Sequence, residues 1–149
     1  MMRISMLINN MLDFIPRVPP KPFKLEKEFQ YWIGQCIEYH HGLWWPYHKM
    51  SDQAIIQKPC DCFYIDSDGR TCFMELKTID SYTLNLKKFE PQQVEFLSKV
   101  SSLQEKGPLA MTYALAVVYS KSLHRWEAFH WDEIEEELME KGSVKLFSK

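Results

Sequence analysis

The sequence lacks several features that would place it in a specialised class. It has no run of about 18 apolar residues, although 46% of its 149 residues are hydrophobic, so it predicts no membrane span. None of its four cysteines forms the C-x-x-C pair typical of zinc and iron–sulfur sites. The net charge is only −2, which excludes a uniformly basic nucleic-acid coat. We therefore expect one ordinary globular domain.

The N-terminus also lacks the pattern of a secretory signal. Its modest apolar stretch is interrupted by Asn9, Asn10 and Asp13, and no small-residue cleavage site follows. Free, buried thiols are typical of a reducing compartment, so we expect a cytoplasmic protein. Residues 16–22 contain four prolines in seven positions and cannot form a helix or a central strand. We expect an arm and proline-rich connector over 1–22 and a single domain over 23–149.

Apolar spacing and turn residues predict the order of elements in that domain. Helical spacing indicates helices, and β-prone runs on either side of Asp68-Gly69 indicate an antiparallel hairpin. The expected elements are a helix over 23–41, a strand over 44–50, a hairpin of 60–65 and 71–77, a loop over 78–89, a helix over 90–106, strands over 109–119 and 125–130, and an acidic helix over 131–140. This order predicts an α/β fold.

The predicted hairpin also gathers residues that carry chemistry. Glu75 and Lys77 lie two residues apart and share one face of their strand, and Asp61 lies on the neighbouring strand. Two adjacent carboxylates favour a bound cation, and a lysine beside them can orient water for attack on a phosphodiester. However, 13 glutamates and 14 lysines give about one Glu-x-Lys by chance. Composition alone favours a solvated ion pair on an exposed strand.

The wider pattern is more specific than the tripeptide. Pro59-Cys60-Asp61 followed by Glu75-Leu76-Lys77 resembles the PD-(D/E)xK nucleases, and residues 59–97 resemble RecU-type Holliday junction resolvases and related phage nucleases. The matching positions are Asp61, Gly69, Phe73, Glu75, Lys77, Thr78, Phe89 and Gln93. More weakly, the resemblance covers residues 24–135. Lys58-Pro59-Cys60 departs from the family's threonine-rich lead-in, and the long insertion that enters a junction is not evident.

The resemblance implies a restriction-endonuclease-like central mixed β-sheet flanked by helices, and a Mg²⁺-dependent DNA endonuclease. Asp61, Glu75 and the carbonyl of Leu76 would ligate Mg²⁺, for which Mn²⁺ would substitute. Lys77 would position the attacking water.

Two further site residues follow from the resemblance, each with an alternative. Glu28 would add an acid from the first helix, and Glu26 fits the same helix face nearly as well. Gln93 would touch the metal shell or the lysine, with Gln92 as its alternative.

The resemblance also implies a partner, which is branched DNA. Lys87, Lys88, Lys49 and His48 are candidate phosphate contacts. A four-way junction has two-fold symmetry, so we expect a homodimer, with the arm 1–22 as a candidate contact. The alternatives are a restriction- or repair-type nuclease acting on duplex or flap DNA, and a non-catalytic DNA-binding module of the same fold.

Overall fold

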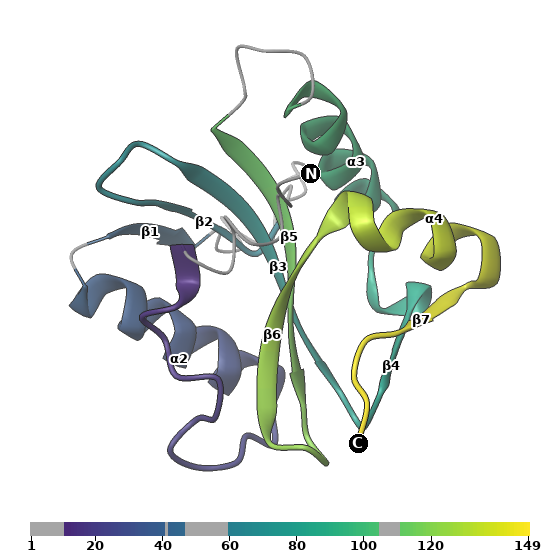
Figure 1. Ribbon diagram of the computed structural model, residues 1–149, viewed down its shortest axis with the longest axis horizontal. Coiled ribbons are helices and arrows are strands. Elements are labelled where there is room, and N and C mark those ends of the chain that lie inside the picture. Colours follow the sequence, from purple (N-terminus) through teal and green to yellow (C-terminus); the bar gives the residue numbers. More distant parts are fainter. Residues whose placement is uncertain (1–10, 41, 47–59, 105–110) are drawn as a thin grey trace, which may run out of the picture.

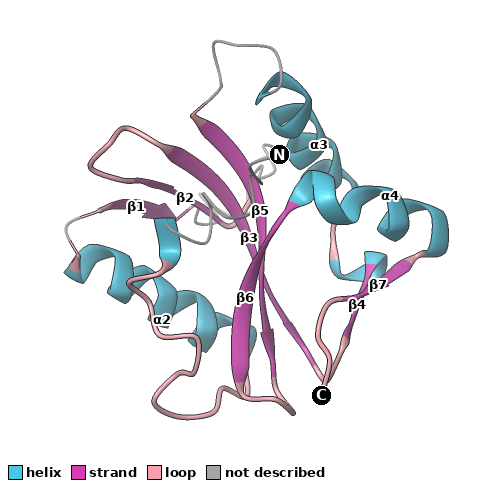
Figure 2. Ribbon diagram, viewed as in Figure 1, coloured by secondary structure: helices cyan, strands magenta, loops and turns pink. Residues whose placement is uncertain are grey.

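The computed structural model contains a central β-sheet (Figure 1). It describes residues 11–40, 42–46, 60–104 and 111–149. Helices lie on both sides of the sheet, and a small two-stranded sheet lies apart from it (Figure 2). In chain order the elements are α2 (Glu26–Tyr39), β1 (Leu43–Pro46), β2 (Cys62–Ile65), β3 (Thr71–Ile79), β4 (Thr83–Asn85), the 3₁₀ helix η1 (Leu86–Lys88), α3 (Pro91–Gln104), β5 (Thr112–Ser120), β6 (Arg125–His130), α4 (Trp131–Lys141) and β7 (Ser143–Lys145).

The central sheet has five strands in the order β1-β2-β3-β5-β6. β3 and β5 run parallel, and every other neighbouring pair is antiparallel. The parallel pair requires a crossover, which β4, η1 and α3 provide. This mixed sheet flanked by helices confirms the predicted fold class.

The β2–β3 hairpin forms as its turn residues predict. Gly69 adopts a φ of 80°, a left-handed conformation that glycine reaches without strain. The Asp66 carboxylate accepts the backbone N–H groups of Asp68 and Arg70 and pairs with the Arg70 guanidinium at 2.7 Å. The turn thereby fixes a register in which Ile65 faces Thr71 and Cys62 faces Met74.

Two hydrophobic cores lie on opposite faces of the sheet. One core contains α2, residues from the N-terminal segment and inward side chains such as Met74 and Leu76. The other lies beneath α3 and α4 and contains Leu97, Trp131 and the alternate strand residues. β3 and β5 are buried on both faces, as is typical of the centre of an α/β sheet.

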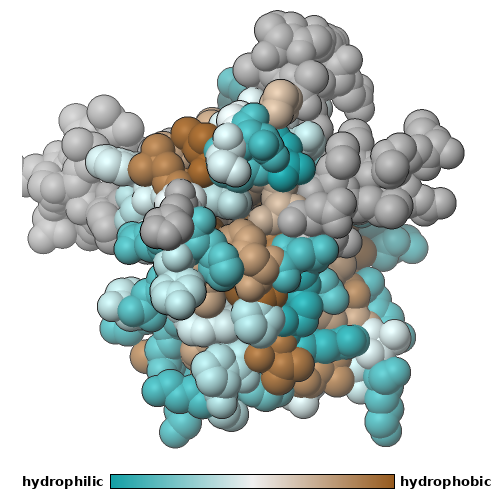
Figure 3. Space-filling model, turned by 60° about the vertical axis from the view of Figure 1, so that its left-hand side comes forward, coloured by the Kyte–Doolittle hydropathy of each residue, from teal (hydrophilic) through white to brown (hydrophobic). Residues whose placement is uncertain are grey.

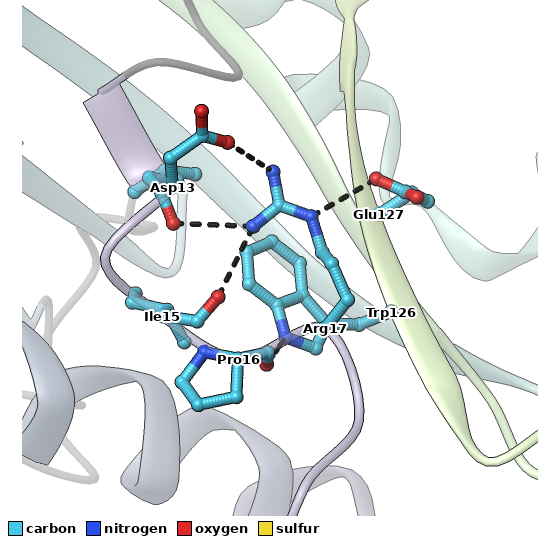
Figure 4. A network of polar contacts seen from close by, with 7 residues as sticks. Asp13, Ile15, Pro16, Arg17, Trp126 and Glu127 are labelled. Atoms are coloured by element: carbon cyan, nitrogen blue, oxygen red, sulfur yellow. Dashed lines mark hydrogen bonds and ion pairs between the residues drawn. The ribbon is translucent and has the colours of Figure 1, made fainter.

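The proline-rich connector packs against the outer strand β6 of its own domain (Figure 4). The Arg17 guanidinium lies 4.1 Å from the Trp126 ring centroid and pairs with Glu127 at 3.1 Å. The Trp126 indole N–H donates to the carbonyl of Pro16 at 2.7 Å. Leu12 is fully buried, so residues 11–22 belong to the fold of this chain. A dimer contact through the arm stays a prediction, and residues 1–10 lie outside the described residues.

The predicted loop over 78–89 is wrong. β3 continues to Ile79, and β4 and η1 follow within the same segment. β4 pairs with β7, with Leu84 opposite Val144 and both side chains buried. Neither strand was expected, because each has three residues and its partner lies some sixty residues away in the chain. The other predicted helices and strands occur. Parts of the elements expected over 23–41, 44–50, 90–106 and 109–119 lie outside the described residues.

The side that carries α2 and β1 presents apolar residues in separate patches among hydrophilic ones (Figure 3). Exposed large side chains on these two elements are those of Tyr31, Tyr39, Leu43 and Trp45. Among the described residues, no helix has the length and apolar character needed to cross a membrane.

Candidate active site

β3 is longer than its partner β2, and this difference leaves part of its edge without a neighbouring strand. The β2–β3 register ends at Met74, whose carbonyl accepts the N–H of Asp61 at 3.1 Å. In a strand, alternate residues direct their backbone groups to the same edge. Leu76 and Thr78 therefore direct theirs to the side that β2 has left. We call the stretch from Leu76 to Thr78 on this side the open edge of β3.

Asp61 lies at the start of the open edge. Its side-chain Oδ2 accepts the N–H of Leu76 at 2.8 Å, and its own N–H donates to Oε2 of Glu75 at 3.1 Å. Only 9% of the residue is exposed. The strand β2 begins one residue later, so the end of the hairpin brings this carboxylate to Glu75.

Glu75 and Lys77 form an ion pair on the face of β3 that carries α3. Lys77 Nζ lies 3.2 Å from Glu75 Oε1, and the two side chains are 9% and 1% exposed. The Phe89 ring, which follows η1, lies 5.2 Å from the same Nζ. The solvated, exposed pair considered from composition is therefore wrong. Burying two charges costs solvation free energy, so such a pair is a poor stabiliser and a good candidate for function.

The electrostatics of this group favour a cation. Burial, followed by the negative charge of Asp61, raises the pKa of Glu75 to about 8, and Lys77 offsets part of that rise. In the metal-free protein, Glu75 therefore gives up its proton less readily than an ordinary glutamate does. A divalent cation beside the two carboxylates would remove the repulsion between them and displace this proton.

The donor set suits a hard cation. Two carboxylates, Asp61 and Glu75, meet at the open edge, and the Leu76 carbonyl faces the same edge. Oxygen ligands of this kind are those that Mg²⁺ and Mn²⁺ prefer. Among the described residues, no group of three or more His, Cys, Asp and Glu side chains could hold a metal. The Leu76 carbonyl would add a third oxygen to the two carboxylates.

Cys60 is a neighbour of the site that sequence reasoning did not assign to it. Its thiol is fully buried, and burial together with the charges of Glu75 and Asp61 raises its pKa well above the usual value. A thiol in this state is a weak nucleophile and a poor metal ligand at neutral pH. Cys60 thus fills space beside the carboxylates.

The helix α2 contributes Glu26 to β3, and Glu28 lies elsewhere. Glu26 Oε1 accepts the N–H of Thr78 at 2.8 Å. Glu28 is exposed, and its carboxylate accepts the N–H groups of Lys24 and Leu25, which lowers its pKa. Glu28 therefore caps the first turn of α2. Both acids lie in the first turn of α2, so the sequence alone does not show which of them meets β3.

Gln30 was not predicted as a site residue, yet it also reaches the open edge. Its side-chain Nε2 donates to the Leu76 carbonyl at 3.4 Å. Gln30 lies four residues after Glu26, so the two side chains share one face of α2. That spacing is a signal, but it has meaning only once the helix is known to lie along β3.

Gln93 is buried at the start of α3, where its side-chain oxygen accepts the N–H of Glu90 at 2.8 Å. This bond ties Gln93 to the first turn of its own helix. The neighbouring Gln92 is less buried. The segment is nonetheless close to the site, because Phe89 packs against Lys77.

The predicted DNA contacts are partly described. Lys87 and Lys88 form the exposed last turn of η1, immediately before Phe89, and their contact with DNA stays a prediction. His48 and Lys49 lie outside the described residues.

Comparison with solved structures finds the same fold in a Holliday junction resolvase. The chain is similar to Hjc, a Holliday junction resolvase from the archaeal hyperthermophile Archaeoglobus fulgidus, with a TM-score of 0.50 and 12% sequence identity. The match covers 71% of this chain and 77% of that one. No protein-family model matches the chain, and no curated protein matches it by sequence. At this identity the likeness establishes the fold, and function has to be argued from the site.

Proposed function

We propose that this protein is a Mg²⁺-dependent endodeoxyribonuclease that hydrolyses phosphodiester bonds in branched DNA. The observation that carries the proposal is the buried group of Asp61, Glu75 and Lys77 at the open edge of β3. The chain places two carboxylates and an amine together at a cost in solvation, on a fold shared with a Holliday junction resolvase.

Asp61, Glu75 and the Leu76 carbonyl would hold the cation, and Mn²⁺ would replace Mg²⁺ there. When bound, it would lower the pKa of a coordinated water and stabilise negative charge on the phosphate. Ionised Glu75 would bind it most tightly, since the protonated acid offers a weaker ligand.

Lys77 would act on the attacking water or on a phosphate oxygen. Its Nζ is held by Glu75 Oε1 and by the Phe89 ring, which fix the amine in one position. A fixed ammonium donates hydrogen bonds without reorganisation as negative charge develops on the phosphate. Asp61 keeps the open edge in place through its bond to the Leu76 N–H.

Glu26 would be the acid that the first helix contributes. One of its oxygens accepts the Thr78 N–H, so its carboxylate borders the open edge, whereas that of Glu28 does not. Gln93 would act from the second helix, at the edge of the site.

The substrate would be a four-way junction bound by a homodimer. Lys87 and Lys88, with Lys49 and His48, would contact phosphates on either side of the cleaved bond. Two sites related by a two-fold axis would then cut the two symmetric strands. The structural neighbour is a Holliday junction resolvase, which supports this choice of substrate.

Cleavage of a labelled four-way junction and of a matched linear duplex tests the proposal. We expect paired nicks in the junction with Mg²⁺, lost with EDTA and in Lys77→Ala. Cleavage of duplex or flap DNA as fast as junction would retain the nuclease and discard the junction selectivity. Binding of DNA by the folded protein without cleavage of any substrate would point to a non-catalytic binding module.

A further inference from the structure

The open edge of β3 is occupied by side chains of α2. Glu26 Oε1 accepts the Thr78 N–H at 2.8 Å, and Gln30 Nε2 donates to the Leu76 carbonyl at 3.4 Å. Each bond is of the kind that a neighbouring strand would otherwise supply. α2 therefore completes, with side chains, the hydrogen bonding that β2 leaves unfinished.

The spacing of the two elements explains how one helix does this. Four residues of an α-helix advance about 6 Å, and two residues of a strand advance about 6.6 Å. Glu26 and Gln30 are four apart, and their targets Thr78 and Leu76 are two apart. The reversed order of the targets shows that α2 runs antiparallel to β3 where they meet. Two side chains from successive turns thus reach alternate residues of the same strand.

Gln30 donates a hydrogen bond to the Leu76 carbonyl oxygen. This is the one backbone atom that the proposed metal site would need as a ligand. The N–H and the carbonyl of Leu76 face the same edge, and the Asp61 carboxylate already holds the N–H. A carbonyl oxygen has two lone pairs, and Gln30 takes one of them. The second lone pair is the one through which this oxygen would bind the cation.

We propose that Gln30 is a positioning residue that orients the Leu76 carbonyl as a ligand for the divalent cation. This inference rests on the proposed function, because it concerns the same metal site. It assigns a role in metal binding to a residue of α2 that does not belong to the group of Asp61, Glu75 and Lys77. Removing a partner that orients a ligand typically weakens metal binding by about tenfold or more.

Mn²⁺ titration of the full chain, followed by the paramagnetic resonance signal of the free ion, tests the proposal. Gln30→Met keeps the length of the side chain and removes its N–H donor. We expect Mn²⁺ to bind this variant about tenfold more weakly than the wild type. Gln35→Met, at an exposed position of the same helix, is the matched control and should bind as the wild type does.

The result that overturns the proposal is equal Mn²⁺ affinity in Gln30→Met and wild type. If the folded wild type binds no Mn²⁺, the proposed metal site fails, and the inference fails with it. A purely structural role for Gln30 would lower the melting temperature of the metal-free protein and leave its Mn²⁺ affinity unchanged.

A second measurement uses the wild type alone and does not depend on the variant folding. During a Mg²⁺ titration followed by NMR, the Leu76 ¹³C carbonyl signal and the Gln30 side-chain amide signals should shift together, with one midpoint. Gln30 signals that stay in place while Asp61 and Glu75 respond would contradict the proposal.

Discussion

Two glutamate–lysine pairs in this protein have nearly the same length and opposite surroundings. Glu75 and Lys77 lie 3.2 Å apart with side chains 1% and 9% exposed, whereas Glu95 and Lys99 on α3 lie 3.1 Å apart with side chains 67% and 70% exposed. The exposed pair contributes little, because water and salt screen it. The buried pair has lost its solvation and adjoins a second carboxylate. Burial and neighbours, not distance, distinguish a candidate site from an ordinary surface contact.

The largest expected difference between the pairs is in metal binding. Glu75→Gln removes one of the two carboxylates and should weaken Mg²⁺ and Mn²⁺ binding by about 100-fold. Glu95→Gln should leave it unchanged. Calorimetric titration of both variants checks this prediction, and equal affinities would show that Glu75 is not a ligand.

The second difference is in how stability depends on pH without metal. The pKa of Glu75 is about 8 in the folded protein, above its ordinary value of 4.5. The folded state therefore binds this proton more tightly, so the free energy of unfolding should fall as the pH rises from about 4.5 to about 8. Above pH 8, Glu75→Gln should be more stable than the wild type.

Urea unfolding of the wild type and Glu75→Gln across this range measures the effect. Burial lowers the pKa of His130 to about 4, which gives the opposite slope between about 4 and 6.5. The difference between the two proteins cancels that contribution, and the window from pH 6.5 to 8 avoids it. A difference that does not change with pH would contradict the raised pKa.

The third comparison removes the lysine of each pair. Lys77→Met leaves ionised Glu75 buried without its ion-pair partner, so it should cost about 2 kcal/mol of unfolding free energy at pH 9. At pH 5, where Glu75 is protonated, the cost should be smaller. Lys99→Met should change stability by less than about 0.5 kcal/mol at both pH values. Similar losses in the two variants would remove the distinction between the pairs.

These two pairs also show which features of the structure could be predicted from the sequence alone. The β-prone runs on either side of Asp68-Gly69 correctly predicted the hairpin, and the period of two placed Glu75 and Lys77 on one face. Those inferences hold because turn chemistry and strand alternation are local. Burial of Lys77 depends on Phe89, which arrives from another element, so the sequence left the exposed pair as an alternative.

The choice between Glu26 and Glu28 could not be made for a related reason. Both lie in the first turn of α2, and only the direction in which that helix crosses the sheet selects the one that meets Thr78. The pairing of β4 with β7 was missed because it joins distant short segments. The short strands β4 and β7 were therefore missed because they depend on a contact between distant segments, which local sequence patterns do not show.

The smallest expected effect concerns the approach of DNA. Lys87 and Lys88 are exposed beside the site, so replacing both with alanine should weaken DNA binding and reduce its dependence on salt. The slope of log affinity against log salt should fall by about one for each phosphate that a lysine no longer neutralises. Fluorescence anisotropy at several salt concentrations measures it, with Lys99→Ala as the control. An unchanged slope would show that these two lysines do not contact DNA phosphates.

Single-turnover cleavage of a four-way junction by Glu75→Gln and Glu95→Gln, each at saturating Mg²⁺, tests the central claim most directly. We predict that Glu75→Gln loses at least about 100-fold in rate while Glu95→Gln cleaves as the wild type does. Cleavage by Glu75→Gln at the wild-type rate would contradict the assignment of the buried group as the catalytic centre.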